Sequence, residues 1–328
     1  MARFDTAVNY NLGAPTVLSA RPDGESASAL QTFAWRGGDL PPSLPLGLDF
    51  LGGDLHGECW SGAGEVERGQ RGGIDWARSG GCLSLSLVLD DAPDRDIEQP
   101  VYLAYRALIE LASEMNCPHL LRAWNYLPAI NEGAGDQERY RRFCLGRARA
   151  LEDDGLDTAS LCAGTAIGGD EQKLRIYLLC GQAPGLNIEN PRQVSAYRYP
   201  RRYGPRSPSF ARATVLPSDG QQALLMISGT ASVVGHETRH EGDVLAQTRE
   251  ILANLDSLLA ESARVSGRDG LASFSEQSLI RVYLRLASDW PPVEAVLREA
   301  WPEARMAAFR GDVCRSDLLV EIEAVTQG

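Results

Sequence analysis

The segment Cys314-Arg315-Ser316-Asp317-Leu318-Leu319-Val320-Glu321-Ile322-Glu323-Ala324 decides the fold of the C-terminal part of this chain. Side chains alternate between the two faces of a β-strand. Glu321 and Glu323 therefore share one face, and the other face carries four apolar side chains: Leu318, Val320, Ile322 and Ala324. Four apolar residues on one face predict a core strand. A carboxylate on its other face is rigidly held and, if it is buried, desolvated, as a general acid near neutral pH requires. The alternative, which the pattern alone leaves open, is that both glutamates face water.

The composition indicates an acidic globular protein that is long enough for two domains. The chain has 328 residues, 44% of them hydrophobic, and 32 basic against 44 acidic side chains give a net charge of −12. Such a surface disfavours nucleic acid and anionic membranes as partners. No segment approaches the length of a membrane-spanning helix, and the polar N-terminus does not resemble a signal peptide. An anionic ligand would therefore need a positive pocket that is built locally.

The cysteine pattern favours a reducing compartment. The number of cysteines is odd, no C-x-x-C pair is present, and the thiols are scattered at positions 59, 82, 117, 144, 162, 180 and 314. This arrangement predicts free thiols in a cytoplasmic protein rather than a disulfide framework or a zinc knuckle.

Hydrophobic periodicity predicts two halves with the same order of elements. The first 80 residues are rich in Gly, Pro and Ser, which predicts turns and short strands. In the first half, the pattern predicts strands at 83–89, 120–127 and 174–179 and helices from 100 and at 136–152. The first of these helices has an apolar stripe that runs from Val101 to Met115. The second half reads as strands at 223–228, 279–286, 305–310 and 318–325 with helices at 241–263 and 292–301. Two β-α-β-α-β halves suggest one fold used twice.

We therefore predict an α+β fold of two such units, each with a mixed sheet packed against helices. The Pro- and Arg-rich stretch 184–208 is the expected linker. The predicted domains are residues 1–190, with the irregular start, and residues 191–328, with the catalytic site.

Two short motifs suggest chemistry that their context does not favour. His236-Glu237-Thr238-Arg239-His240 matches the H-E-x-x-H string of zinc metallopeptidases, with Glu261 as a conceivable third ligand. That chemistry needs the string inside a helix, whereas strand- and turn-forming residues precede it. A chance match is the preferred interpretation, and no metal is expected. The glycine-rich stretch 164–169 fits neither a P-loop nor a dinucleotide-binding fingerprint.

Clustered arginines suggest recognition of a carboxylate. The segment 199–212 places four arginines and two tyrosines between prolines, and Arg281, Tyr283 and Arg285 alternate along a predicted strand. Guanidinium groups bind carboxylates bidentately, and tyrosine hydroxyls add uncharged donors. The alternative is that each arginine pairs with one of the many surface carboxylates.

Several strings resemble the chorismatase family, and they cover roughly residues 80–326. The most specific are the segments 203–213, 227–238 and 314–324, and the segments 122–131 and 141–147 are also similar. The C-terminal half further resembles the RidA/YjgF fold, whose chains end in a similar V-E-I-E-A strand. The resemblance therefore implies that each half is a RidA/YjgF-like unit.

This resemblance implies that chorismate, a small dianion, is split into pyruvate and a ring product without a metal or organic cofactor. Glu321 takes the position of the catalytic acid, which protonates the methylene carbon of the enol ether. A neutral carboxyl is needed for this step, so burial must raise the pKa of Glu321.

Two positions indicate the branch of the family. Cys314 and Gly229 match the branch that forms 3-hydroxybenzoate, as in pigment biosynthesis, whereas the hydrolytic branch carries a small aliphatic residue and an alanine there. The ring hydroxyl would then displace pyruvate intramolecularly, with Cys314 lining the ring. The resemblance also allows 4-hydroxybenzoate as a second product.

The expected carboxylate-binding residues come from the linker and the facing strand. They are Tyr203, Arg206, Arg212, Arg281, Tyr283 and Arg285. The alternatives are a chorismatase that hydrolyses chorismate to a dihydroxycyclohexadiene carboxylate, a RidA-like enamine or imine deaminase, a non-catalytic protein that binds small acids, and a zinc hydrolase. A deaminase of that family would be less than half as long. A monomer is favoured, because the duplicated halves can replace contacts between subunits.

Overall fold

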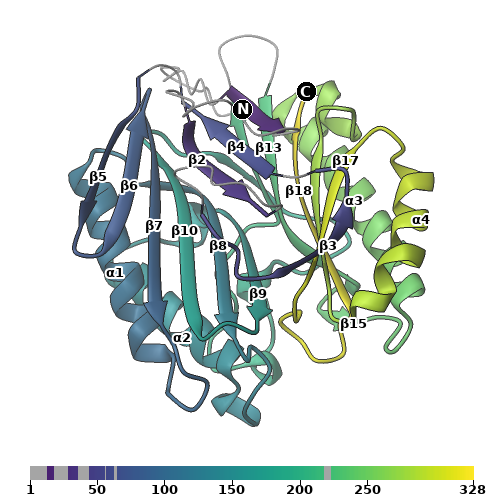
Figure 1. The fold of residues 1–328 in the computed structure, drawn as a ribbon, viewed down its shortest axis with the longest axis horizontal. Helices are drawn as coiled ribbons and strands as arrows, with labels where there is room; N and C mark the ends of the chain where they lie inside the picture. The colour runs from purple at the N-terminus through teal and green to yellow at the C-terminus, as the bar shows by residue number, and fades with distance from the viewer. Residues whose placement is uncertain (1–12, 18–28, 36–43, 56, 63–64, 218–222) are drawn as a thin grey trace.

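The computed structural model describes residues 13–17, 29–35, 44–55, 57–62, 65–217 and 223–328. Its first large unit is a six-stranded sheet in the order β5-β6-β7-β10-β8-β9, with two helices on one face (Figure 1). The elements of this unit are β5 (Glu67–Arg71), β6 (Ile74–Ser79), β7 (Cys82–Asp90), α1 (Glu98–Glu114), β8 (His119–Pro128), α2 (Arg139–Asp153), β9 (Ala163–Gly169) and β10 (Lys173–Gly181).

The second unit repeats this topology strand for strand. Its order β11-β12-β13-β18-β16-β17 matches that of the first sheet, and the β8–β9 and β16–β17 pairs are the parallel ones among antiparallel neighbours. Its elements are β11 (Leu186–Ile188), β12 (Ala213–Pro217), β13 (Ala223–Ala231), the hairpin β14 (Val233–Val234) and β15 (Glu237–Thr238), α3 (Val244–Ser266), β16 (Leu279–Leu284), α4 (Trp290–Ala300), β17 (Arg305–Arg310) and β18 (Val320–Gln327). The predicted α+β fold of two β-α-β-α-β units with mixed sheets is confirmed.

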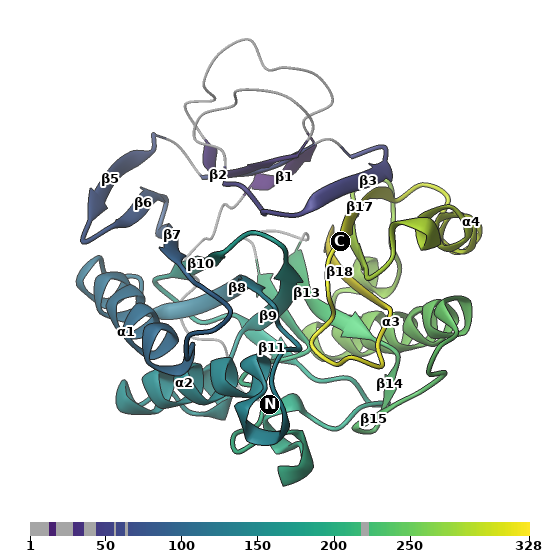
Figure 2. The same ribbon diagram turned by 60° about the horizontal axis from the view of Figure 1, so that its bottom comes forward.

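The two helical layers lie on opposite flanks of the molecule, and the sheets face each other between them (Figures 1 and 2). The apolar stripe of α1 that the sequence predicts, from Val101 to Ala112, is buried in the first core. The inner faces of the two sheets share a separate core rich in aromatic residues, including Trp124, Tyr177 and Phe309. Polar groups between the sheets are therefore held away from water and must find partners there.

The N-terminal strands close the space above the two sheets. β1 (Gly13–Val17), β4 (Gly57–Ser61) and β2 (Ala29–Ala34) form a three-stranded sheet, and β3 (Asp49–Gly53) joins the second large sheet beside β17 (Figure 2). These are short strands, as the composition predicts. β11 precedes the predicted domain boundary at residue 190 and yet belongs to the second sheet, so the chain changes sheet between β10 and β11.

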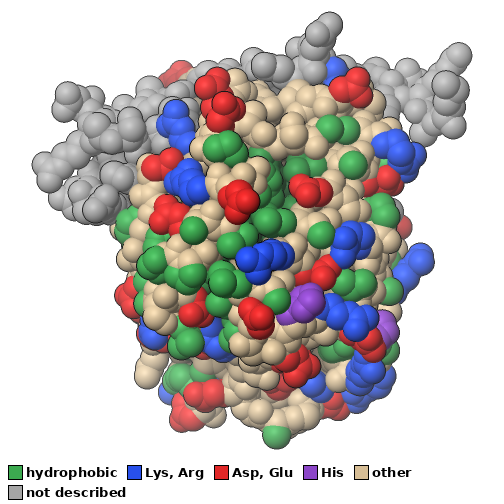
Figure 3. Space-filling view, turned by 90° about the vertical axis from the view of Figure 1, so that its right-hand side faces the viewer, with side chains coloured by type: hydrophobic (Ala, Val, Ile, Leu, Met, Phe, Trp, Pro, Cys, Tyr) green, Lys and Arg blue, Asp and Glu red, His purple; other side chains and the backbone are tan. Residues whose placement is uncertain are grey.

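Among the described residues, no helix has both the length and the apolar character needed to cross a membrane. On the face drawn in Figure 3, acidic and basic side chains are interspersed and neither sign dominates a large area.

Candidate active site

Glu321 and Glu323 lie side by side on the inner face of β18, which runs between β13 and β16. Only 4% and 3% of their surfaces are exposed. Val320, Ile322 and Ala324 point the other way, into the core under α3 and α4. The predicted alternation is confirmed from Val320 to Ala324, whereas Leu318 precedes β18 and packs in a separate small cluster with Val233 and Val313. The alternative in which both glutamates face water is wrong.

An irregularity in β13 makes room for the carboxylate of Glu321. The pairing of β13 with β18 shifts register between Ile227 and Thr230, which is a β-bulge of the kind often found beside active sites. Gly229 lies in this bulge, and a Cβ atom added there would overlap Oε1 of Glu321. The backbone N–H of Gly229 is fixed by a 3.0 Å hydrogen bond to Oγ1 of Thr165 on β9. An alanine here would therefore force the carboxylate of Glu321 to move.

The surroundings of Glu321 favour the neutral acid. Burial raises the pKa of Glu321 to about 8, the negative charge of Glu323 acts in the same direction, and Arg122 and Arg212 oppose the shift. Within the described residues, Glu321 has no hydrogen bond and no ion pair that would favour its charged form. At neutral pH this carboxyl can donate a proton.

Glu321 faces a cavity of about 330 Å³ that continues into a recess of about 50 Å³. Both are bounded by Glu321, Gly229, Cys314 and Tyr140. The walls come from both units: α2, β8 and β9 from the first, and β13, β18 and the segment 199–212 from the second. A volume of this size suits a small ligand.

Cys314 enters the cavity from the loop between β17 and β18. Burial raises the pKa of its thiol, and the charge of Glu321 adds to that effect, so the side chain is a neutral thiol rather than a nucleophilic thiolate. Arg285 holds this loop: its Nε donates to the carbonyl of Leu318 at 3.1 Å and its Nη2 to that of Arg315 at 3.1 Å. It also pairs with Asp312. Arg285 is therefore committed to the loop, outside the cavity.

Two buried arginines in the cavity wall have unused donors. Arg212 donates to Val194 O at 2.9 Å and to the Tyr199 hydroxyl at 2.7 Å, and Arg147 donates to Ser209 O. The Nε atom of each is buried without a partner among the described residues. Neither forms an ion pair there. Glu189 interacts with the charge of Arg212 without forming an ion pair, and among the described residues no carboxylate acts on Arg147, so positive charge remains available for an anionic ligand.

A third arginine lies near the opening. The guanidinium of Arg315 stacks over the ring of Tyr203 at 4.1 Å and that of Tyr199 at 5.2 Å, and its Nη1 donates to His236 O at 3.0 Å. Stacking fixes the plane of the guanidinium while leaving donors for a ligand. Tyr203 thus lies at the cavity, as the sequence analysis expects.

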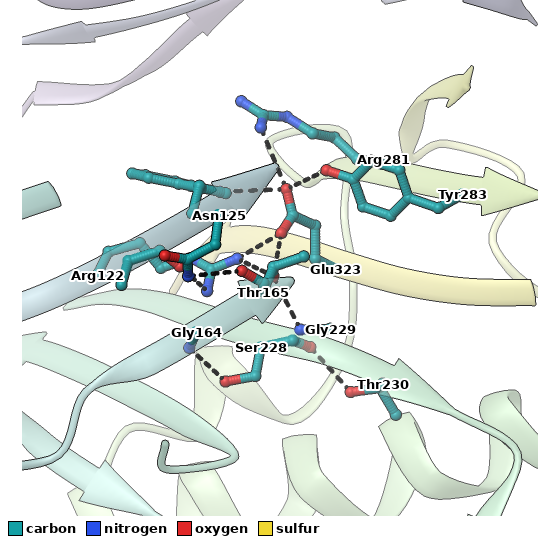
Figure 4. A network of polar contacts seen from close by, with 12 residues as sticks. Arg122, Asn125, Gly164, Thr165, Ser228, Gly229, Thr230, Arg281, Tyr283 and Glu323 are labelled. Atoms are coloured by element: carbon teal, nitrogen blue, oxygen red, sulfur yellow. Dashed lines mark hydrogen bonds and ion pairs between the residues drawn. The ribbon is translucent and has the colours of Figure 1, made fainter. Parts of the chain in front are cut away.

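Three other predicted binding residues lie outside the cavity. Arg206 is exposed and pairs with Glu152 on the surface. Arg281 and Tyr283 are buried behind the cavity, where both donate to Glu323 at 3.2 Å and 2.9 Å (Figure 4). With Arg285, these are the corrections to the predicted set: the alternation along β16 identified the correct face, but Glu323 on the neighbouring strand takes up the donors.

The H-E-x-x-H string does not form the helix that zinc chemistry requires. It spans the hairpin of β14 and β15, His236 contacts Arg202, and His240 contacts Glu250. Within the described part of the chain, no group of three potential ligands comes together. The chance match is the better interpretation.

Comparison with known proteins identifies the family. A family profile described as "Chorismatase FkbO/Hyg5-like, N-terminal" matches residues 58–180. The 3-hydroxybenzoate synthase of Streptomyces hygroscopicus is 40% identical over 294 residues, which are 87% of this chain and 85% of that protein. The chain belongs to the chorismatase family. A chorismatase of Streptomyces rapamycinicus is 38% identical over 276 residues, 82% of this chain and 81% of that protein. A crystal structure of a chorismatase matches with a TM-score of 0.83 and 31% identity over 96% of this chain and 99% of that chain.

Sequence reasoning missed the part of this chorismatase cavity that the first unit supplies. Tyr140, Cys144 and Arg147 follow each other at intervals of four and three along α2, so they share its buried face. An arginine on the buried stripe of a helix was the available signal. Thr165 had no such signal, because the glycine-rich stretch around it resembles a turn more than the strand β9 that it forms.

Proposed function

We propose that this protein converts chorismate to 3-hydroxybenzoate and pyruvate, with Glu321 as the catalytic acid. The observation that carries the proposal is a buried carboxyl that has no partner among the described residues and that faces a cavity whose wall includes two buried arginines without an ion pair among the same residues. The 40% identity to a protein named 3-hydroxybenzoate synthase supports the choice of substrate and product.

The proposed chemistry begins with proton transfer to carbon. Glu321 protonates the terminal methylene carbon of the enolpyruvyl group, and the ether bond to the ring then breaks as the ether oxygen becomes the keto oxygen of pyruvate. The neighbouring ring hydroxyl attacks the ring carbon from which pyruvate leaves. The hydroxyl gives its proton to Glu321, which restores the acid form of that residue. The resulting arene-oxide-like species opens and rearomatises to 3-hydroxybenzoate. Substrate and products have the same atoms, so no water is consumed.

Arg147, Arg212 and Arg315 are the proposed partners of the two substrate carboxylates. Arg147 and Arg212 are buried in the wall, and neither has an ion pair among the described residues. Arg315 stacks over Tyr203 near the opening. They supply positive charge locally in a protein of net charge −12. Fixing both ends of the substrate would hold the methylene carbon at Glu321, and such orientation is a large part of catalysis.

Cys314 and Gly229 are the proposed determinants of the intramolecular route. A neutral thiol is a poor nucleophile and a weakly hydrated surface, so Cys314 can line the ring without holding an attacking water. Gly229 lets the Glu321 carboxyl lie flat against β13. Both features favour attack by the ring hydroxyl over attack by water.

The deciding experiment incubates purified protein with chorismate and resolves the products by liquid chromatography with mass detection. Pyruvate with 3-hydroxybenzoate supports the proposal, and the same run measures any 4-hydroxybenzoate. Pyruvate with a dihydroxycyclohexadiene carboxylate supports chorismate as the substrate but overturns the intramolecular attack by the ring hydroxyl. Absence of turnover overturns the proposal and favours a deaminase or a binding protein.

We also propose a monomer in the cytoplasm. The inner faces of the two sheets already pack on each other within one chain, and all seven cysteines are free thiols. Light scattering coupled to size-exclusion chromatography tests the monomer, and a mass of two or more chains contradicts it.

A further inference from the structure

The two buried glutamates of β18 have opposite environments. They are two residues apart on one strand face, which separates them by roughly 6–7 Å. Among the described residues, Glu321 lacks a hydrogen-bond partner, whereas Glu323 accepts from five side chains. Figure 4 shows Arg122, Thr165, Arg281 and Tyr283 around Glu323. These donors are Arg122, Trp124, Thr165, Arg281 and Tyr283. The surroundings of Glu323 therefore stabilise a carboxylate anion, whereas the described residues around Glu321 provide no donor that would do so.

The site of Glu323 is rigid because both units contribute donors to it. Arg122, Trp124 and Thr165 come from β8 and β9, and Arg281 and Tyr283 come from β16. Arg281 is itself shared with Glu58 of β4, at 2.9 Å, and stacks on Phe33 at 4.3 Å. Two guanidinium groups and three further donors form a site for a carboxylate anion that cannot relax away.

Thr165 connects this ion cluster to the floor under Glu321. Its Oγ1 accepts from Nη2 of Arg122 at 2.7 Å and from the backbone N–H of Gly229 at 3.0 Å, and it donates to Glu323. Gly229 is the residue against which the Glu321 carboxyl lies. The position of Glu323 relative to Glu321 is therefore fixed through β9 as well as along β18.

We propose that Glu323 is a positioning residue for the Glu321 acid: its fixed negative charge beside Glu321 keeps that carboxyl in the neutral form from which it donates. This inference rests on the proposed function, because it assigns a purpose to the proton of Glu321. Glu323 does not face the cavity, so its action is electrostatic and does not involve contact with the substrate. Like charges at this separation in a buried site oppose each other strongly.

Each charged neighbour of Glu321 moves the pKa of that residue in a known direction. Burial comes first in raising its pKa, Glu323 also raises it, and Arg122 and Arg212 lower it. The titratable groups around the pair are Glu58 of β4, Arg122 and Tyr126 of β8, Tyr140, Cys144 and Arg147 of α2, Arg212 before β12, Arg281 and Tyr283 of β16, and Cys314 before β18. Removing an anion and removing a cation from the cluster must therefore move the titration of Glu321 in opposite directions.

The test measures kcat/KM for chorismate against pH in Glu323→Gln and Arg122→Gln. Glu323→Gln is expected to move the basic limb of the profile down by about one pH unit, because the acid form of Glu321 is lost earlier. Arg122→Gln is expected to move that limb up, and Glu323 remains held there by Arg281, Tyr283, Trp124 and Thr165. Glu323→Asp keeps the charge and is expected to keep the limb near its wild-type position.

The inference is overturned if both variants fold and the basic limb of the kcat/KM profile stays in place in Glu323→Gln and in Arg122→Gln. This holds even if turnover falls, because a purely structural role lowers activity without moving the pH profile. Where Glu323→Gln does not fold, Arg122→Gln decides alone, and absence of an upward shift overturns the inference. If the wild-type protein does not turn over chorismate, the proposed function fails separately. In that case, infrared spectroscopy follows the titration of the Glu321 carboxyl, whose band is the one that disappears in Glu321→Gln. The pH at which this band titrates should shift down in Glu323→Gln and up in Arg122→Gln.

Discussion

The substitution Gly229→Ala tests the geometry of the acid most directly. The added methyl group would overlap Oε1 of Glu321, and real Cβ atoms essentially never approach another heavy atom within 3.0 Å. The φ angle of Gly229 lies outside the left-handed region, so alanine introduces no backbone strain there. The whole effect should fall on the carboxyl, which has to move by on the order of 1 Å.

A displacement of that size has a predictable cost. Misplacing a catalytic group by about 1 Å lowers the rate ~100-fold, which corresponds to ~2.7 kcal/mol of activation free energy. Steady-state kinetics with chorismate measures the loss, and thermal unfolding confirms that the variant is folded. A moved carboxyl also leaves the ring less shielded, so the share of dihydroxycyclohexadiene carboxylate among the products should rise.

A double-mutant cycle separates the overlap from other effects of the methyl group. Glu321→Asp shortens the acid by one methylene and vacates the space above Gly229. The methyl should therefore cost little in the aspartate background, and the two losses should be strongly non-additive. Gly229→Ala with unchanged kcat, or with the same loss in both backgrounds, would refute the placement of Glu321 against β13.

Four further predictions follow from the same site. Glu321→Gln should lower kcat by ~10²- to 10⁴-fold while calorimetry still detects chorismate binding, and near-normal turnover would remove Glu321 from the mechanism. Because the acid form is active and the pKa is raised to about 8, kcat/KM should be constant below that pH and fall about tenfold per unit above it; a limb near pH 5 would contradict this. Cys314→Ala should shift product toward the dihydroxycyclohexadiene carboxylate, and an unchanged product ratio refutes its specificity role. Arg147→Gln should raise KM about 10- to 100-fold, whereas the matched surface variant Arg206→Gln should leave it unchanged, and equal effects would contradict the assignment.

Local sequence patterns were sufficient where one strand or helix determines the outcome. The alternation from Val320 to Ala324 predicted the inner face of β18, and the stripe of α1 predicted its buried side. Such patterns also indicated the face of β16 that carries Arg281 and Tyr283. They could not indicate that Glu323, some forty residues later, would use these donors, because the pairing of β16 with β18 is a long-range contact.

The cavity itself depends on contacts between the two units. Arg147 and Thr165 belong to the first unit, while Glu321 and Gly229 belong to the second, and no local pattern links them. A deletion of the first half would therefore remove part of the cavity wall together with three of the donors to Glu323, namely Arg122, Trp124 and Thr165.

The proposed acid belongs to one copy of the repeated unit, and the equivalent position in the other copy carries a tyrosine. The Arg-x-aromatic sequences of β8 and β16 occupy equivalent places in the two sheets, and Arg122 and Arg281 both converge on Glu323. In β10, the strand equivalent to β18, Tyr177 lies opposite Trp124, as Glu321 lies opposite Tyr283. Tyr177 donates to Pro45 O at 2.6 Å and is closed off in the core. One copy of the fold thus carries the acid, and the other contributes Arg122 to the ion cluster beside it. The electrostatics of the site therefore depend on both copies, although the proposed proton donor lies in only one of them.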